Sequence, residues 1–390
     1  MTFRGKLIFV STLGATLLLS SCGQMVQLAN QLIDQSQHRA QMQGPSADSL
    51  VQVARVYAEG HRHAAGSSAA LAVDPLADGS EQEQEYKSQI TLDLLNKDYD
   101  SLEKEAHASL SPAARFAGGT WHVFGYYEAL SAPPDPNATD AEWNAQINAI
   151  KAWVAARPNS SAARIALAAV YDDFGHKARG GGYADTVSAD GWRLLDERLA
   201  LTAKTLVDAA KLPEKSPYWF SLMFDVALTQ GWDKSQAKAL LDAAISFEPS
   251  YYHAYRQYGN FIAPKWYGEE GDAQAFAEQV ATQIGGEQGD FVYFEIASTL
   301  ACGCDTEQDR AHLQGFSWPQ VKSGYAAMEP LYGHASLKTN RFAYMAVLET
   351  DKASAQAAFA VIGNNQAPDT WPSRAYFFQS KAWAQYPGAQ

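Results

Sequence analysis

Residues 237–268 read AKALLDAAISFEPSYYHAYRQYGNFIAPKWYG, and this stretch decides the fold. Pro249 separates two segments with helical periodicity, Ser250 can cap the second of them, and Pro264 ends it. The residues that recur at helical spacing are Ala237, Leu241 and Ala244 in the first segment and Tyr251, Tyr255, Tyr258 and Ile262 in the second. The stretch therefore predicts two helices joined by a Pro-containing turn.

A second junction of the same kind follows Pro158. Ser160 can cap the next helix, which again combines small residues with an aromatic ring, Tyr171. The order of residues resembles a degenerate tetratricopeptide (TPR) junction: small residues, then a proline, then bulky residues and a glycine. An ordinary antiparallel helix pair is the alternative. No convincing run of alternating residues predicts strands. We therefore expect an all-α fold, a TPR-like α-solenoid of stacked helical hairpins.

Composition narrows the class of protein. The chain has 390 residues, enough for one large domain or two smaller ones, and 47% of them are hydrophobic. Its formal net charge is −13, from 30 Lys and Arg against 43 Asp and Glu. Because no basic run offsets this charge, we expect no nucleic-acid partner and no flat association with an anionic lipid surface.

The N-terminus predicts a cell compartment. An apolar run at residues 7–19 follows two basic residues and has the length of a signal peptide, too short to span a bilayer. It ends in LSSC, which resembles a bacterial lipobox with Cys22 as the lipidated residue. A plain signal peptide with an incidental Cys22 is the alternative. Residues 1–21 are thus predicted as a lipoprotein signal peptide. Gly23, where Asp would indicate inner-membrane retention, favours the periplasmic face of the outer membrane.

The remaining chain divides by composition. Residues 22–85 have linker composition, with short stretches at 25–32 and 50–57 that could be helical. Residues 86–285 carry the clearest helical pattern, and 286–390 are predicted as further TPR-like helices. The membrane is therefore expected to be reached through the lipid anchor alone.

A glycine-rich loop at residues 175–183 is one candidate site. Its glycines expose backbone N–H groups, and Lys177 and Arg179 add positive charge, so it could bind an anion. It does not match a phosphate-binding P-loop, which needs Lys and then Ser or Thr after its second glycine. A kinked loop between helices is the alternative.

Two cysteines and two acidic pairs are further candidates for a disulfide, a metal site or a catalytic pair. Cys302 and Cys304 could form a local disulfide or part of a metal site, but no further ligand is evident, and we expect no metal. Asp172 and Asp173 are adjacent in sequence, as are residues 269–270, and neighbours on a helix do not face each other. They are poor candidates for a glycosidase pair. We predict no catalytic residue and no cofactor.

Aromatic residues are more frequent than helix packing needs, with 10 Trp, 19 Tyr and 17 Phe. Tyr251, Tyr255, Trp266 and Tyr267 could line a surface that binds sugars or peptide side chains. Core packing is the alternative for each of them.

Three stretches together carry a family resemblance: RGGGYA at 179–184, EPSY at 248–251 and PKWYGE at 264–269. They resemble an uncharacterised bacterial family with a domain of unknown function built of TPR-like helices. The resemblance spans about residues 86–285, and its most specific part is the run Lys-Trp-Tyr-Gly. It implies the fold and implies no activity.

We therefore expect a lipid-anchored periplasmic helical-repeat scaffold that binds a protein or peptide partner in the cell envelope, and no enzyme. The alternative is an envelope enzyme or a binder of small ligands or glycans, with a site formed by Arg179, Tyr183, Lys265, Trp266 and Tyr267. A purely structural spacer is a third possibility. Whether Arg179, Lys265 and Trp266 share one cavity separates the first two hypotheses.

Overall fold

The computed structural model describes residues 44–59, 80–182, 184–301 and 305–387. These residues form seventeen α-helices and three short 3-10 helices, and they contain no strand apart from one isolated bridge between Arg115 and Trp121. The α-helices are α2 (Ala47–Glu59), α3 (Ser80–Leu95), α4 (Tyr99–Ser109), α5 (His122–Ser131), α6 (Asp140–Ala156), α7 (Ser161–Arg179), α8 (Ala189–Ala209), α9 (Tyr218–Gln230), α10 (Lys234–Phe247), α11 (His253–Phe261), α12 (Asp272–Ile284), α13 (Gly286–Leu300), α14 (Thr306–Leu313), α15 (Trp318–Tyr332), α16 (Ser336–Leu348), α17 (Lys352–Ile362) and α18 (Arg374–Gln385). The predicted all-α class is confirmed.

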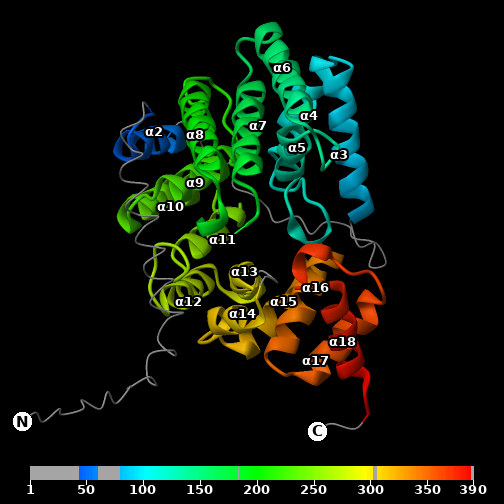
Figure 1. Ribbon diagram of the computed structural model, residues 1–390. Coiled ribbons are helices and arrows are strands. Elements are labelled where there is room, and N and C mark those ends of the chain that lie inside the picture. Colours follow the sequence, from blue (N-terminus) through cyan, green and yellow to red (C-terminus); the bar gives the residue numbers. More distant parts are fainter. Residues whose placement is uncertain (1–43, 60–79, 183, 302–304, 388–390) are drawn as a thin grey trace, which may run out of the picture.

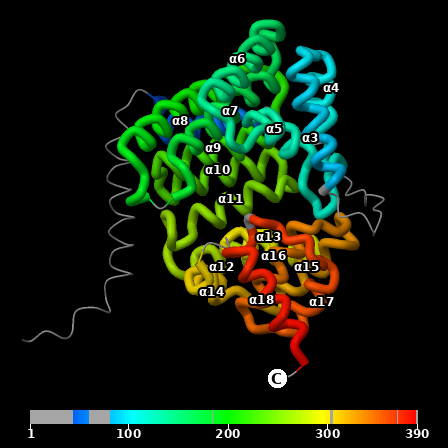
Figure 2. Tube along the Cα trace, turned by 45° about the vertical axis from the view of Figure 1, so that its right-hand side comes forward, coloured from blue at the N-terminus to red at the C-terminus, as the bar shows by residue number. Residues whose placement is uncertain are grey.

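Helices that follow one another along the chain pack as neighbours, as a helical-repeat fold requires. The most extensive contacts are between α7 and α8, α12 and α13, α13 and α15, and α16 and α17. In Figures 1 and 2, α3 to α9 form one part of the molecule and α12 to α18 the other, with α11 at the boundary. Within the described ranges, no helix has the length and apolar content needed to cross a membrane.

The two predicted junctions differ in their caps. After Pro158, the Ser160 hydroxyl accepts a hydrogen bond from Ala163 N at 2.9 Å and caps α7, as predicted. After Pro249, the predicted cap by Ser250 is wrong, because α11 begins at His253 and no side chain caps it. The Ser250 hydroxyl instead donates to the Glu248 carboxylate at 2.6 Å. The junction after Pro249 is therefore a turn that contacts from other parts of the chain must stabilise.

Part of the predicted linker is a helix that belongs to the folded body. Helix α2 packs against α10, and its Tyr57 ring stacks on Trp219 with centroids 4.5 Å apart. The Tyr57 hydroxyl accepts a hydrogen bond from Ser216 N at 2.6 Å and is fully buried. Residues 47–59 are thus an additional helix of the fold, in agreement with the helical stretch predicted at 50–57 and not with a flexible tether there.

A short loop before α5 joins the two parts of the molecule. The Arg115 guanidinium donates to the carbonyls of Pro112 at 2.9 Å, Gly119 at 3.2 Å and Ser250 at 3.1 Å. It also lies against the rings of Trp121, Tyr252 and Tyr332, at 4.7, 5.6 and 5.1 Å. Gly118 N donates to Gly333 O at 3.1 Å. The loop therefore contacts both the turn before α11 and the end of α15.

Candidate functional site

Tyr251 and Tyr255, two predicted partner contacts, are buried. The Tyr251 hydroxyl lies 3.0 Å from Ser221 Oγ, and its ring packs edge-on against Trp121. The Tyr255 hydroxyl donates to Pro249 O at 3.2 Å. Only 3% and 5% of these two residues are exposed, so neither ring offers a face to a partner. Both serve core packing, the alternative that the sequence left open.

Packing also explains half of the Lys-Trp-Tyr-Gly run. The Tyr267 hydroxyl donates to Leu228 O at 2.7 Å, and its ring packs against Phe261. A Cβ on Gly268 would lie 1.6 Å from the Ile262 carbonyl oxygen, so only glycine fits there. Lys265 is exposed and Trp266 is half-buried. Core packing, the alternative that the sequence left open, therefore accounts for Tyr267, and a close approach of the backbone accounts for Gly268.

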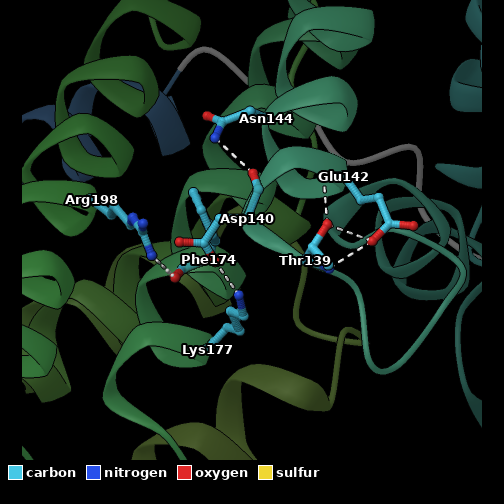
Figure 3. A network of polar contacts seen from close by, with 7 residues as sticks. All are labelled: Thr139, Asp140, Glu142, Asn144, Phe174, Lys177 and Arg198. Atoms are coloured by element: carbon cyan, nitrogen blue, oxygen red, sulfur yellow. Dashed lines mark hydrogen bonds and ion pairs between the residues drawn. The ribbon is translucent and has the colours of Figure 1, made fainter.

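The cations of the glycine-rich loop are already engaged. Arg179 Nη1 donates to the carbonyls of Gly180 at 2.8 Å and Gly182 at 3.1 Å, and the guanidinium lies over the Trp192 ring at 5.3 Å. Lys177 forms an ion pair with Asp140 at the start of α6 (Figure 3). The loop is thus held as an inter-helix connection, the alternative that the sequence left open.

The contacts of the two predicted binding segments go to different elements. Arg179 contacts its own loop and α8, whereas Tyr267 contacts α9 and the charge of Lys265 acts on His312 of α14. None of these contacts links Arg179 with Trp266. They therefore give no support to the predicted cavity shared by Arg179, Lys265 and Trp266. Four other predicted residues lie outside the described part of the chain: Cys22, Tyr183, Cys302 and Cys304.

A different set of residues converges across α7, α9, α11, α13 and α16. We call it the charged cluster, and it comprises Asp172, Asp173, Asp225, His253, Arg256, Gln257, Glu295 and Lys338. Two sets of contacts start from the adjacent residues Arg256 and Gln257 of α11, one toward each end. Gln257 Nε2 lies 3.4 Å from Asp225 Oδ1, and the neighbouring Arg256 reaches Glu295 Oε2 at 3.7 Å. Glu295 Oε1 in turn lies 2.8 Å from Lys338 Nζ.

One end of the charged cluster, the acidic end, consists of Asp172, Asp173 and Asp225. Burial raises the pKa of Asp173 to about 6, against a hydrogen bond from Ser131 that lowers it. Burial and the charge of Asp173 raise the pKa of Asp225 to about 7. Burial and the other two carboxylates also raise the pKa of Asp172 well above its ordinary value. Asp173 and Asp225 therefore exchange protons near neutral pH.

The other end, the basic end, has more cations than carboxylates. Glu295 and Lys338 are almost completely buried. Burial lowers the pKa of Lys338 to about 8 although Glu295 opposes this. Burial disfavours ionised Glu295, but the charges of Lys338 and Arg256 hold its pKa below the ordinary value. Burial, with the nearby cations, lowers the pKa of His253 well below its ordinary value, so this imidazole is neutral.

Solvent reaches the middle of the charged cluster. The middle consists of His253, Arg256 and Gln257, which are each only partly buried, as are Asp173 and Asp225 of the acidic end. The His253 ring packs against Phe124 of α5 at 4.7 Å and against Tyr251 at 5.9 Å, which ties the cluster to the aromatic core. Charged groups on both sides of a solvent-accessible middle can bind polar ligands without a large desolvation cost.

The cluster offers groups for proton exchange and for binding polar ligands. In the ranges that the structure describes, no three His, Cys, Asp or Glu side chains are arranged to hold a metal ion. Carboxyls with pKa values of about 6 and 7 can accept or donate protons, and the cations opposite can bind carboxylates or carbonyls.

Sequence reasoning found only part of this site. It considered Asp172 and Asp173 only as a glycosidase pair and set them aside, and it missed Asp225, which comes from another helix. Glu295 and Lys338 are separated by 43 positions, and neither lies in a recognisable motif. A charged residue within an otherwise apolar run, such as Glu295 in FVYFEIA at residues 291–297, was the available signal.

Comparison with family models, with curated proteins and with solved structures finds no match to this chain. The resemblance to a family of unknown function therefore remains a prediction.

Proposed function

We propose that this chain is a lipid-anchored helical-repeat scaffold of the bacterial cell envelope, and that it binds a protein or peptide partner at the charged cluster. The observation that supports binding there is the convergence of opposite charges from α7, α9, α11, α13 and α16, with a partly exposed middle at His253, Arg256 and Gln257. Helical-repeat proteins commonly bind extended partners along faces built from successive helices. A peptide offers both charges and backbone polar groups to such a face.

The anchor in this proposal is Cys22. The basic residues, the short apolar run and the LSSC sequence support lipidation there, and Gly23 supports the periplasmic face of the outer membrane. We expect Cys22→Ser to release the protein from the membrane fraction, measured by fractionation and by labelling with radioactive palmitate. Full membrane retention of the unlabelled variant would contradict the anchor.

Affinity capture tests the binding function. The full chain carrying Arg256→Gln is compared with wild type and with Arg157→Gln, whose guanidinium is exposed and pairs with Asp100 at 2.5 Å. We expect wild type and the Arg157 variant to retain the same envelope partner and the Arg256 variant to lose it, because Arg256 belongs to the partly exposed middle of the cluster. Equal capture by all three folded proteins would contradict binding at the charged cluster.

A further inference from the structure

Among the described residues, no Lys or Arg side chain forms an ion pair with the acidic end of the charged cluster. Asp172 and Asp173 lie on α7 and Asp225 on α9, and the nearby cations of α7 and α8 are engaged elsewhere. Lys177 pairs with Asp140, and Arg198 Nη1 donates to Phe174 O at 2.5 Å, as Figure 3 shows. The negative charge of the acidic end is therefore not neutralised by these side chains.

Asp172 provides a separate observation. The residue is 4% exposed, and its Oδ1 has no hydrogen-bond donor among the described residues. Its Oδ2 lies 3.8 Å from His176 Nε2, too far for a hydrogen bond. Burial lowers the pKa of His176, so this ring adds no positive charge near neutral pH. An unsatisfied buried acceptor destabilises the fold, and a ligand carrying N–H groups would supply the missing hydrogen bond.

The donors around the other two carboxylates are also few. Gln257 Nε2 reaches Asp225 Oδ1 at a long 3.4 Å while it donates to Ser221 O at 2.9 Å. Ser131 is hydrogen-bonded to Asp173, but its hydroxyl also donates to Glu128 O at 3.1 Å. Oxygen acceptors thus exceed N–H and O–H donors at the acidic end.

We propose that the acidic end binds an organic cation, the ammonium group of a lysine side chain or of an N-terminus on the partner peptide. This proposal rests on the proposed function and adds the chemistry that the partner must present. An ammonium group supplies three N–H donors and one positive charge, which matches one unpaired buried oxygen and two partly exposed carboxylates. The described residues hold no metal-ligand arrangement here, which favours an organic cation over a metal ion.

Binding at this end depends on pH in one direction. The groups that act on Asp225 are Asp172 and Asp173 of α7 and Gln257 of α11, and Glu128 of α5 acts on Asp173. His176 of α7 lies near Asp172 but is neutral. As pH rises through 6 and 7, Asp173 and Asp225 lose protons and the acidic end gains negative charge. Affinity for a cation therefore rises with pH, and binding releases protons.

Cadaverine, a diamine, is the probe, and isothermal titration calorimetry with the full chain is the measurement. We expect saturable binding at pH 8 and at least about tenfold weaker binding at pH 5.5, with proton release in the intermediate range. Asp225→Asn keeps the shape of the side chain and removes the charge, so it should weaken binding at pH 8 about tenfold or more. Asp208→Asn is the control, because Asp208 is exposed on α8 and pairs with Lys211, and it should bind as wild type does.

Three outcomes would overturn the proposal: no saturable heat at pH 8, equal affinity of the folded Asp225→Asn protein, or displacement of cadaverine by micromolar calcium. Failure here is distinguishable from failure of the proposed function. If cadaverine does not bind but Arg256→Gln still abolishes partner capture, the cluster binds a partner without an ammonium group. If capture is also unaffected, both proposals fail.

Discussion

Gly268 shows how one residue fixes a turn. Its missing Cβ leaves room for the Ile262 carbonyl, which a side chain would meet at 1.6 Å. We expect Gly268→Ala to lower the free energy of unfolding by about 2–4 kcal/mol, because the backbone of the turn has to move. Urea denaturation of the variant provides the measurement.

Gly181→Ala is the matched control. A Cβ at Gly181 meets nothing within 4 Å, so its effect should stay within about 0.5 kcal/mol. If both variants are equally stable, steric exclusion does not explain the glycine of the Lys-Trp-Tyr-Gly run.

Asp225 makes stability depend on pH. Its folded pKa of about 7 lies above the ordinary value of 3.8. The folded state favours the protonated carboxyl of Asp225, so its contribution to stability is fully present below the unfolded pKa. This contribution is lost as pH rises through the folded pKa. Asp225→Asn should therefore be more stable than wild type at pH 8, by about 1–3 kcal/mol, and nearly equal to it at pH 4.5. Denaturation curves at the two pH values measure this difference, and a variant that is less stable at pH 8 would contradict the raised pKa.

At the scale of elements, α2 shows that a helix can be hidden in a polar region. Its sequence is flanked by linker-like composition, yet Tyr57 stacks on Trp219 and its hydroxyl meets Ser216 N at 2.6 Å. Tyr57→Ala should cost about 3–5 kcal/mol of unfolding free energy, because it leaves a cavity and removes a buried hydrogen bond.

Val56→Ala on the same helix is the control for Tyr57→Ala. Val56 is 67% exposed, and its loss should cost less than about 0.5 kcal/mol. Thermal unfolding followed by circular dichroism compares the two variants. Equal melting temperatures would mean that α2 is not part of the cooperative fold.

Helices were predictable where their signals are local. Ser160 caps α7 because the serine, the spacing and the helix start lie within four residues. Ser250 carried the same signal, but its hydroxyl donates to Glu248 instead of capping α11. Its carbonyl accepts hydrogen bonds from both Arg115 and Trp121, which hold the turn. Propensity gives way to tertiary contacts at such positions, and these contacts come from residues more than a hundred positions away.

At the scale of the whole molecule, Arg115 connects the two parts of the fold. It reaches Ser250 before α11 and packs against Tyr332 at the end of α15. Arg115→Met should lower the unfolding free energy by about 2–4 kcal/mol, because three carbonyl acceptors lose their donor. Faster amide hydrogen exchange at residues 112–121 and 248–252 should accompany it.

Arg157→Met is the control for the Arg115 variant. The Arg157 side chain is 41% exposed and pairs with an exposed carboxylate, so its removal should cost less than about 1 kcal/mol. If the two variants behave alike in stability and in hydrogen exchange, Arg115 does not join the two parts.

The charged cluster is also a property of the whole molecule. Asp172, Asp225, Glu295 and Lys338 lie on four helices, and no spacing rule brings them together. The all-α class could be predicted because periodicity is local, whereas this cluster depends on how the helices pack. The sequence therefore pointed to Tyr251 and Tyr255, which turned out to be buried.

Photo-crosslinking in the native host tests the central claim that the charged cluster binds a partner. A diazirine amino acid is placed at position 257, in the partly exposed middle of the cluster, and at position 201 on α8 as the control, where Leu201 is 43% exposed. The account predicts one discrete adduct at position 257, none at position 201, and loss of the adduct when Arg256→Gln is added. No adduct at position 257, or the same adducts at both positions, would contradict it.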